Sequence, residues 1–202
     1  MARAGLETEE VILKAVKNPR MVEELLSGLS APDSSKLARA KALNLLSERH
    51  PESLYLHYDF FVCLLDDPHR ILKWNAIIIL GNLAGVDSQR RFDTVFSAYF
   101  RHLRDGDLIT AANLVGAAGK IARARPDLAG RITSEILDVE VIPLPTSECR
   151  EIARGKALMA FGDNIDTFRG DSRVGEFARK CLGSRRPATR KKAEALIKKL
   201  SA

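Results

Sequence analysis

One turn-and-helix pattern recurs along the whole chain and constrains its fold more than any other feature. Its clearest copy is residues 65–85, LDDPHRILKWNAIIILGNLAG, where a short acidic turn precedes a helix that is apolar on almost every side. The order Asp66-Asp67-Pro68 predicts an acidic N-cap with proline at the first helical position, and Ala84-Gly85 predicts a left-handed C-cap. A helix that is apolar all round must be covered by neighbours on several faces. A chain that repeats such a helix is predicted to be an all-α repeat protein.

Helical periodicity and turn residues place ten further helices around this pattern. The expected helices span residues 8–17, 20–29, 34–48, 51–65, 68–84, 88–104, 108–124, 126–139, 147–163, 171–182 and 187–200. The first is expected to begin at an N-cap formed by Thr8, and Pro32-Asp33 is expected to form the turn after the second.

The second helix of each pair aligns with the others in columns. One column holds Ala42, Ala76, Leu114, Ala157 and Ala193, and five residues later stand Ser47, Gly81, Gly119, Gly162 and Lys198. The steps between successive rows are 34, 38, 43 and 36 residues, which is typical of two-helix repeats. We therefore expect a single repeat domain over 1–202, capped by the helix at 8–17, with repeats at about 19–49, 51–85, 88–124, 126–165 and 171–200.

The fourth repeat is longer than the others because it carries about nine extra residues between its two helices. They include the irregular stretch 141–147, with Pro143 and Pro145. Insertions on one side of a repeat array often form binding loops, and a spacer is the alternative.

The columns resemble a known family. The segment Leu65-Asp66-Asp67-Pro68, continued by Leu72-Lys73-Trp74-Asn75-Ala76 and Leu80-Gly81, resembles a HEAT repeat, of the group shared with armadillo proteins. Basic residues recur at the position of Lys73 in three other repeats, whereas the third has Thr110-Ala111 there. The resemblance implies a right-handed α-α superhelix, or solenoid, of about five helical hairpins, with the second helices lining its concave face.

The resemblance also implies a role for the basic column, which consists of Arg39, Lys73, Arg154 and Arg190. In HEAT proteins this position pairs with turn aspartates, which here would be Asp33, Asp66 and Asp107; phosphate binding is the alternative. The fourth and fifth repeats show no obvious turn acid, so Arg154 and Arg190 are candidates for binding something else.

Charge and cysteine content narrow the class of protein further. From Arg150 onward the chain has 14 Lys and Arg against 6 Asp and Glu, a net charge of +8, whereas the first 149 residues have a net charge of −2. Cys63 and Cys181 fall on apolar stripes, which predicts buried free thiols in a reducing compartment. The longest apolar run, 76–80, is too short to span a bilayer, and no signal peptide is visible. These features predict a cytoplasmic protein without a membrane partner.

Trp74 and two polar columns are the candidate partner-binding residues. Trp74 has small residues beside it in its column, and either packs there as a core indole or forms the floor of a groove for a partner side chain. The amide groups of Asn75, Asn82 and Asn113 offer a donor and an acceptor to the backbone of an extended peptide, and a solvated helix face is the alternative. Three lysines lie in the same polar columns: Lys41, Lys120 and Lys156.

No catalytic or metal-binding motif stands out among these columns. The four histidines lack metal-ligand spacing, and residues 116–121 lack the pattern of a phosphate loop. We therefore expect a non-enzymatic repeat scaffold or adaptor, without cofactor or metal, that binds a protein or peptide on its concave face. Its oligomeric state is not indicated. The alternative is a nucleic-acid-binding protein that uses Arg185, Arg186, Arg190, Lys191 and Lys192, with weak and salt-sensitive binding.

Overall fold

The computed structural model describes residues 2–29 and 35–202, and for residues 2–8 it describes the backbone alone. Every regular element in this part of the chain is helical, which confirms the all-α class. The chain forms two compact units, Met1–Asp93 and Thr94–Ala202. The assignment of one continuous repeat domain to residues 1–202 remains a prediction, as does the turn at Pro32-Asp33, which lies outside the described residues.

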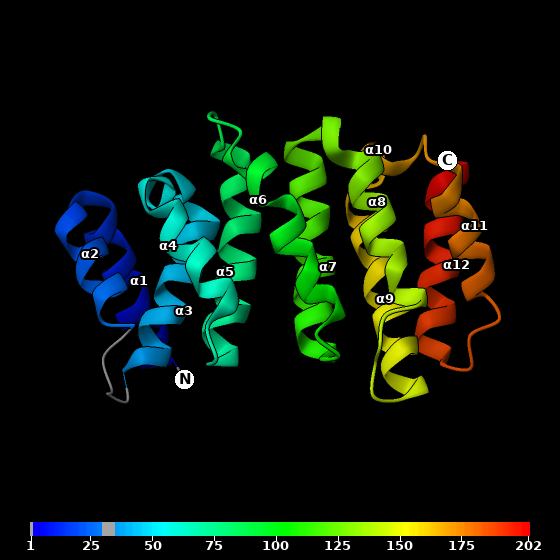
Figure 1. Cartoon of the computed structure of the whole chain (residues 1–202), viewed down its shortest axis with the longest axis horizontal. Coiled ribbons are helices and arrows are strands. Elements are labelled where there is room, and N and C mark those ends of the chain that lie inside the picture. The colour runs from blue at the N-terminus through cyan, green and yellow to red at the C-terminus, as the bar shows by residue number, and fades with distance from the viewer. Residues whose placement is uncertain (1, 30–34) are drawn as a thin grey trace. The chain divides into compact units, whose positions relative to one another are not determined.

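The first unit contains helices that pair and stack as a repeat protein requires (Figure 1). These helices are α1 (Ala2–Lys17), α2 (Pro19–Ser27), α3 (Lys36–Arg49), α4 (Tyr58–Cys63) and α5 (Arg70–Leu83). Helix α1 packs on α2 and α3, and α3 packs in turn on α5, so successive second helices are neighbours. Glu9 of α1 and Arg49 of α3 add an ion pair at 2.5 Å.

Helix α1 begins earlier than the sequence predicted. It starts at Ala2 rather than at an N-cap formed by Thr8, whose side chain lies outside the described part of the chain. Alanine and arginine are strong helix formers, and they extend the helix through the residues before Thr8.

Helix α5 has the expected apolar character but neither of the expected ends. Its buried residues fall in every turn, from Leu72 to Leu83. The helix begins at Arg70 with His69 as N-cap, because the Asp67 carboxylate accepts a hydrogen bond from the His69 backbone N–H at 2.7 Å and holds an Asx turn in front of the helix. At the other end the chain continues into a 3₁₀ turn, Ala84–Val86, so the left-handed C-cap predicted at Gly85 is wrong.

The helix predicted over 51–65 is interrupted. The segment consists of 3₁₀ turns at Pro51–Ser53, Tyr55–His57 and Leu64–Asp66, with only α4 between them as α-helix. A 3₁₀-helix has about 3.0 residues per turn, whereas the sequence prediction assumed the 3.6 of an α-helix. The prediction therefore places some side chains on the wrong face of this segment. Cys63 is therefore exposed, contrary to the prediction, whereas Cys181 is buried as predicted, and both are free thiols.

The second unit repeats the same packing with longer second helices (Figure 1). Helix α6 (Arg91–Phe100) begins in the last residues of the first unit and continues into the second. The other helices of the second unit are α7 (Leu108–Ala124), α8 (Ala129–Leu137), α9 (Ser147–Asp163), α10 (Ile165–Phe168), α11 (Ser172–Cys181) and α12 (Pro187–Ser201), with 3₁₀ turns at Arg101–Arg104, Pro126–Leu128 and Asp138–Glu140. Helix α9 packs against α7 on one side and α12 on the other. The short helix α10 was not predicted, whereas α7 and α9 have the predicted bounds.

Helices α7 and α9 approach closely at Gly119, one of the small residues aligned in the sequence. A Cβ atom at this position would lie 2.6 Å from the side-chain nitrogen of Asn164 and 3.2 Å from the carbonyl oxygen of Ala160. That carbonyl already accepts a hydrogen bond from Asn164 at 2.9 Å, so the amide is not free to move aside without breaking it. The absence of a side chain therefore sets the spacing between the two helices.

We expect Gly119→Ala to lower the free energy of unfolding by about 1–3 kcal/mol, because the added methyl group overpacks this contact. Gly116→Ala is the matched control: Gly116 lies one turn earlier in α7, is exposed, and has nothing within 4 Å of the position its Cβ would occupy. It should stabilise the protein by about 0.5–1 kcal/mol through helix propensity alone. Urea unfolding measures the change in the free energy of unfolding for each variant. A change of the same sign in both would contradict the close approach of α7 and α9 at Gly119.

Candidate functional site

The second helices carry most of the residues predicted to bind a partner, and they present them with different degrees of exposure. Lys41 of α3 and Lys156 of α9 are exposed, whereas Trp74, Asn75 and the rest of the predicted set are partly exposed. The latter group is Trp74, Asn75, Asn82, Asn113 and Lys120. None of the set is fully buried, so each side chain reaches the surface of its own unit.

Trp74 is half-buried in α5. The aligned position of its column on α3 is Ala40, which is buried. Part of the Trp74 side chain is accessible to solvent. Trp74 is thus intermediate between the two interpretations of the sequence, a packed core residue and the floor of a groove.

The asparagines of α5 join neighbouring second helices. The Asn75 side-chain oxygen accepts a hydrogen bond from Asn44 of α3 at 3.0 Å, and its amide nitrogen donates to the backbone of Ile71 at 2.8 Å. Asn82 donates to the hydroxyl of Ser47, a fully buried residue of α3, at 2.9 Å. An asparagine amide has two donors and two lone pairs, so Asn75 keeps one of each for a partner.

The basic residues near the C-terminus differ in how far they are already engaged. Arg186 pairs with Glu148 at 2.8 Å, and Arg190 donates to the carbonyl oxygens of Ser184 and Arg185 at 2.8 and 3.3 Å. Arg185 and Lys191 are exposed, and Lys192 is partly exposed. One guanidinium nitrogen of Arg190 thus holds the turn between α11 and α12, and a role of this residue in binding remains a prediction.

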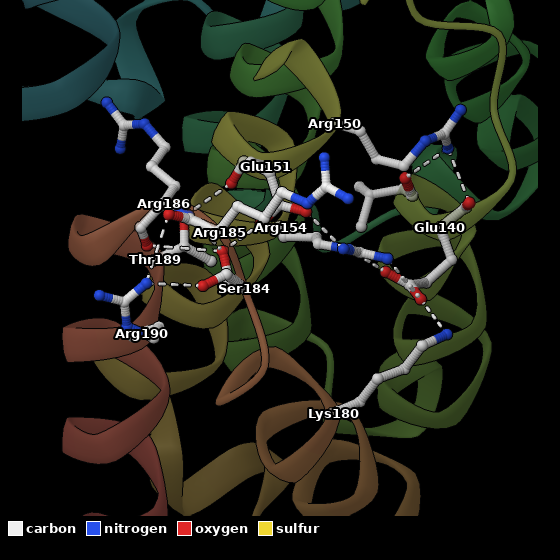
Figure 2. Close-up of polar contacts among 11 residues, drawn as sticks. Glu140, Arg150, Glu151, Arg154, Lys180, Ser184, Arg185, Arg186, Thr189 and Arg190 are labelled. Atoms are coloured by element: carbon white, nitrogen blue, oxygen red, sulfur yellow. Dashed lines mark hydrogen bonds and ion pairs between the residues drawn. The ribbon is translucent and has the colours of Figure 1, made fainter. Parts of the chain in front are cut away.

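A polar network around Glu140 was missed in the sequence (Figure 2). The Glu140 carboxylate ends the 3₁₀ turn after α8 and accepts a hydrogen bond from Arg154 of α9 at 2.5 Å. It also pairs with Lys180 of α11. Arg154 binds Glu151 as well, at 2.5 Å. Arg154 is thus held by two carboxylates, and the expectation that it lacks an acidic partner is wrong.

The same network continues to the last helical pair (Figure 2). The hydroxyl of Ser184 donates to the Glu151 carboxylate, and the Thr189 hydroxyl donates to the Glu151 carbonyl oxygen at 2.8 Å. Ser184 and Thr189 are both buried. Through these contacts the fourth pair of helices, α8 and α9, is joined to the fifth pair, α11 and α12.

The charges in this network stabilise one another. Burial raises the pKa of Glu140, but hydrogen bonds from Arg154 and Lys180 outweigh it, and the net effect is a lowered pKa. The hydrogen bond from Arg154 to Glu140 raises the pKa of Arg154, and burial opposes it. Glu140 and Arg154 are therefore both charged at neutral pH, as a structural ion pair between helices requires.

The insertion of the fourth repeat is anchored at its start. The Arg150 guanidinium donates to the carbonyl oxygens of Val139, Glu140 and Ile142, at 3.3, 2.6 and 3.1 Å. Ile142 is buried, whereas Val141 is 76% exposed. These contacts fix the beginning of the loop, and they leave both interpretations of it, binding loop and spacer, compatible with the structure.

The far side of the insertion lies against the turn between α6 and α7. The carbonyl oxygen of Pro143 is 3.4 Å from the position that a Cβ of Gly106 would occupy, and Gly106 has a φ of 77°. A positive φ of this size favours glycine. The conformation of this turn therefore favours glycine at the position that the insertion approaches.

Two signals in the sequence could have identified the network. Glu140 follows the last leucine of its helix, Leu137, by three residues, as the turn acids of other repeats follow theirs at short distance. Arg150 and Arg154 lie four residues apart and so share one face of α9, which the insertion must cover.

Within residues 2–29 and 35–202, no group of three or more His, Cys, Asp or Glu side chains is arranged to hold a metal ion. In the same part of the chain, no helix has the length and apolar character needed to cross a lipid bilayer.

Neither a protein-family model nor a curated protein matches this chain. Similar folds do occur among solved structures. Crystal structures of two engineered proteins, both from the Northeast Structural Genomics Consortium, are similar to this chain. The first has 17% identity and a TM-score of 0.56, and the match covers 96% of this chain and 88% of that one. The second has 19% identity and a TM-score of 0.55, and covers 90% of this chain and 48% of that one.

A designed armadillo repeat protein also matches, with 15% identity, a TM-score of 0.36, and coverage of 88% of this chain and 98% of that one. The likeness to the two engineered proteins concerns the fold alone. Together with the stacked helical pairs in each unit, it establishes a helical repeat fold.

Proposed function

We propose that this chain is a HEAT-like repeat scaffold that binds a protein or peptide partner through its second helices, and that it catalyses no reaction itself. The observation that carries the proposal is the half-buried Trp74 beside Asn75, which keeps a free donor and lone pair. Tryptophan is enriched among the residues that carry most of the binding energy of protein interfaces, and an asparagine amide can both donate and accept hydrogen bonds.

The ion pair of Arg154 with Glu140 supports the HEAT-like assignment. Arg154 stands in the basic column, and Glu140 follows the first helix of the same repeat, which is where the resemblance implies an acidic partner. Burial and the hydrogen bonds among Glu140, Arg154 and Lys180 account for the shifted pKa values of Glu140 and Arg154, so neither shift requires a catalytic role to explain it.

The proposal is tested by replacing the single tryptophan. We expect Trp74→Ala to weaken binding of a partner isolated from the source organism by about tenfold or more, since buried aromatic residues dominate interface energies. The loss of stability should stay below the roughly 3–5 kcal/mol that truncation of a core tryptophan costs. Because Trp74 is the only tryptophan, its fluorescence should shift and become protected from a quencher when the purified partner binds.

Leu56→Ala is the matched control, since Leu56 is a large apolar residue that is 88% exposed in the same unit. It should leave both partner binding and stability unchanged. The proposal fails if Trp74→Ala binds the partner as tightly as the parent does. Fluorescence that resists quenching in the free protein, with a stability loss in the core range, would instead place the indole in the core.

A further inference from the structure

Helix α12 crosses α9 so closely that a lysine of one helix lies over a glycine of the other. Two hydrogen bonds fix the crossing: Thr189 to the carbonyl oxygen of Glu151 at 2.8 Å, and Lys199 to that of Gly162 at 2.7 Å. Between them, the ammonium nitrogen of Lys192 is 3.5 Å from the position a Cβ of Gly155 would occupy. The Lys192 side chain therefore reaches across α9 to the residue next to Lys156.

The two lysines bring positive charge together without an acidic partner. Lys156 is exposed and Lys192 is partly buried, and neither side chain makes a hydrogen bond or ion pair within residues 2–29 and 35–202. Burial lowers the pKa of Lys192, the positive charges of Lys156 and Arg186 lower it further, and only Asp163 acts in the opposite direction. A partly buried cation among like charges is unfavourable unless an anion joins it.

We propose that Lys156 and Lys192, with Arg186 at the edge, form a site for the carboxylate side chains of an acidic peptide segment in the protein partner. The site lies on second helices, so this inference rests on the scaffold function proposed above and adds the chemistry of the partner. A carboxylate bound at these lysines supplies the missing negative charge and accepts charge-assisted hydrogen bonds from ammonium groups.

The surroundings favour an acidic peptide over nucleic acid. The equivalent position on α7 is the neutral Asn113, the next row on α9 holds Asp163, and Glu148 already pairs with Arg186. The row of positive charge formed by Lys156 and Lys192 therefore does not continue onto α7 or along α9, whereas a nucleic-acid strand needs cations along its whole path and aromatic side chains for its bases. The one aromatic residue of α9, Phe161, is buried, and α12 has none.

The test uses three fluorescein-labelled probes with the full chain: a glutamate-rich peptide, its glutamine counterpart, and a single-stranded DNA of similar length. We expect anisotropy to show binding of the glutamate peptide and not of the glutamine peptide. The double variant Lys156→Ala/Lys192→Met should weaken binding about tenfold. Lys198→Ala removes an exposed lysine from another face of α12 and should change the affinity by less than about twofold.

Thermal unfolding separates a binding lysine from a structural one. Lys192→Met keeps the length of the side chain and removes a partly buried cation that has no partner, so we expect the unfolding midpoint of the free protein to rise by about 2 °C. A lysine that stabilises the fold would lower the midpoint when replaced. A gain in stability coupled to a loss of peptide affinity is thus the result expected of a site built for an anion.

Three results would overturn this site: equal affinity of parent and double variant for the glutamate peptide, a lower midpoint for Lys192→Met, or tighter binding of the DNA that the double variant abolishes. The last result would assign the two lysines to nucleic acid. Partner binding that still depends on Trp74 would show, in each case, that the scaffold function stands without the acidic site. If partner binding does not depend on Trp74 while the glutamate peptide still binds, the acidic-peptide site would stand and the proposed role of Trp74 would fail.

Discussion

Truncation of Phe161 is expected to remove about 3–5 kcal/mol from the free energy of unfolding, the range typical of a fully buried phenylalanine. Phe161 lies on α9 and is 0% exposed. Its ring meets Phe168 of α10 edge-on at 5.0 Å and Phe177 of α11 at 6.2 Å. Phe161→Ala therefore opens a cavity where three helices meet and removes two aromatic pairs that contribute beyond their buried area. Urea unfolding followed by circular dichroism measures the loss.

Met159→Ala provides the control in the same helix, because Met159 is 40% exposed and its truncation leaves no enclosed cavity. It should lower stability by less than about 1 kcal/mol. The stability loss of Phe161→Leu should lie between those of Phe161→Ala and Met159→Ala, because leucine fills part of the space but cannot form the aromatic pairs. A Phe161→Ala variant as stable as Met159→Ala would mean that the three helices do not share a core.

The sequence predicted the second helices better than the first ones, and helix capping explains the difference. Helices α7 and α9 have the predicted bounds because Asp107 and Thr146 cap them with side-chain hydrogen bonds that a sequence pattern specifies. The segment 51–66 has no such cap and is short, so its backbone divides between 3₁₀ and α hydrogen bonding. Its buried residues still recur three to four residues apart, which is why the apolar pattern alone resembled one helix.

The candidate surface was predictable only in part, because contacts across helices depend on side-chain reach. The asparagines were assigned to a partner from their column, and their bonds to Asn44 and Ser47 of α3 could not be read from one helix. The residues that join at Glu140 come from three helical segments, and the insertion separates Glu140 from Arg154. Comparing equivalent positions of the repeats identifies residues that recur from one repeat to the next. Glu140 lies beside the insertion, which only the fourth repeat carries, so this comparison does not identify it.

Glu140→Gln is expected to lower the free energy of unfolding by about 2–3 kcal/mol at neutral pH, the range for hydrogen bonds that involve charged groups. The glutamine keeps the size of the side chain and removes the charge that Arg154 and Lys180 both contact. Arg154 and Glu140 are 21% and 16% exposed, so solvent screens this pair less than a surface pair. Urea unfolding of the parent and the variant gives the difference directly.

Glu148→Gln is the matched control, since Glu148 also pairs with an arginine of the last helical pair, at 2.8 Å, but is 63% exposed. Its replacement should lower stability by no more than about 0.5 kcal/mol. Equal effects of the two substitutions would show that the Glu140 network adds nothing beyond a surface ion pair.

The effect of Glu140→Gln should also depend on pH, and its direction follows from the lowered pKa of Glu140 in the folded protein. A group whose pKa is lower folded than unfolded stabilises the fold fully above its unfolded pKa, and loses that contribution as the pH falls through the folded pKa. Glutamine resembles the protonated carboxyl group, so the stability difference between parent and variant should be constant near neutral pH and shrink below about pH 4.5, the ordinary pKa of a glutamate side chain. Other carboxylates titrate equally in both proteins and cancel in the comparison. A difference that stays constant to the acid limit would mean that the charge of Glu140 contributes nothing, and that the loss arises from shape alone.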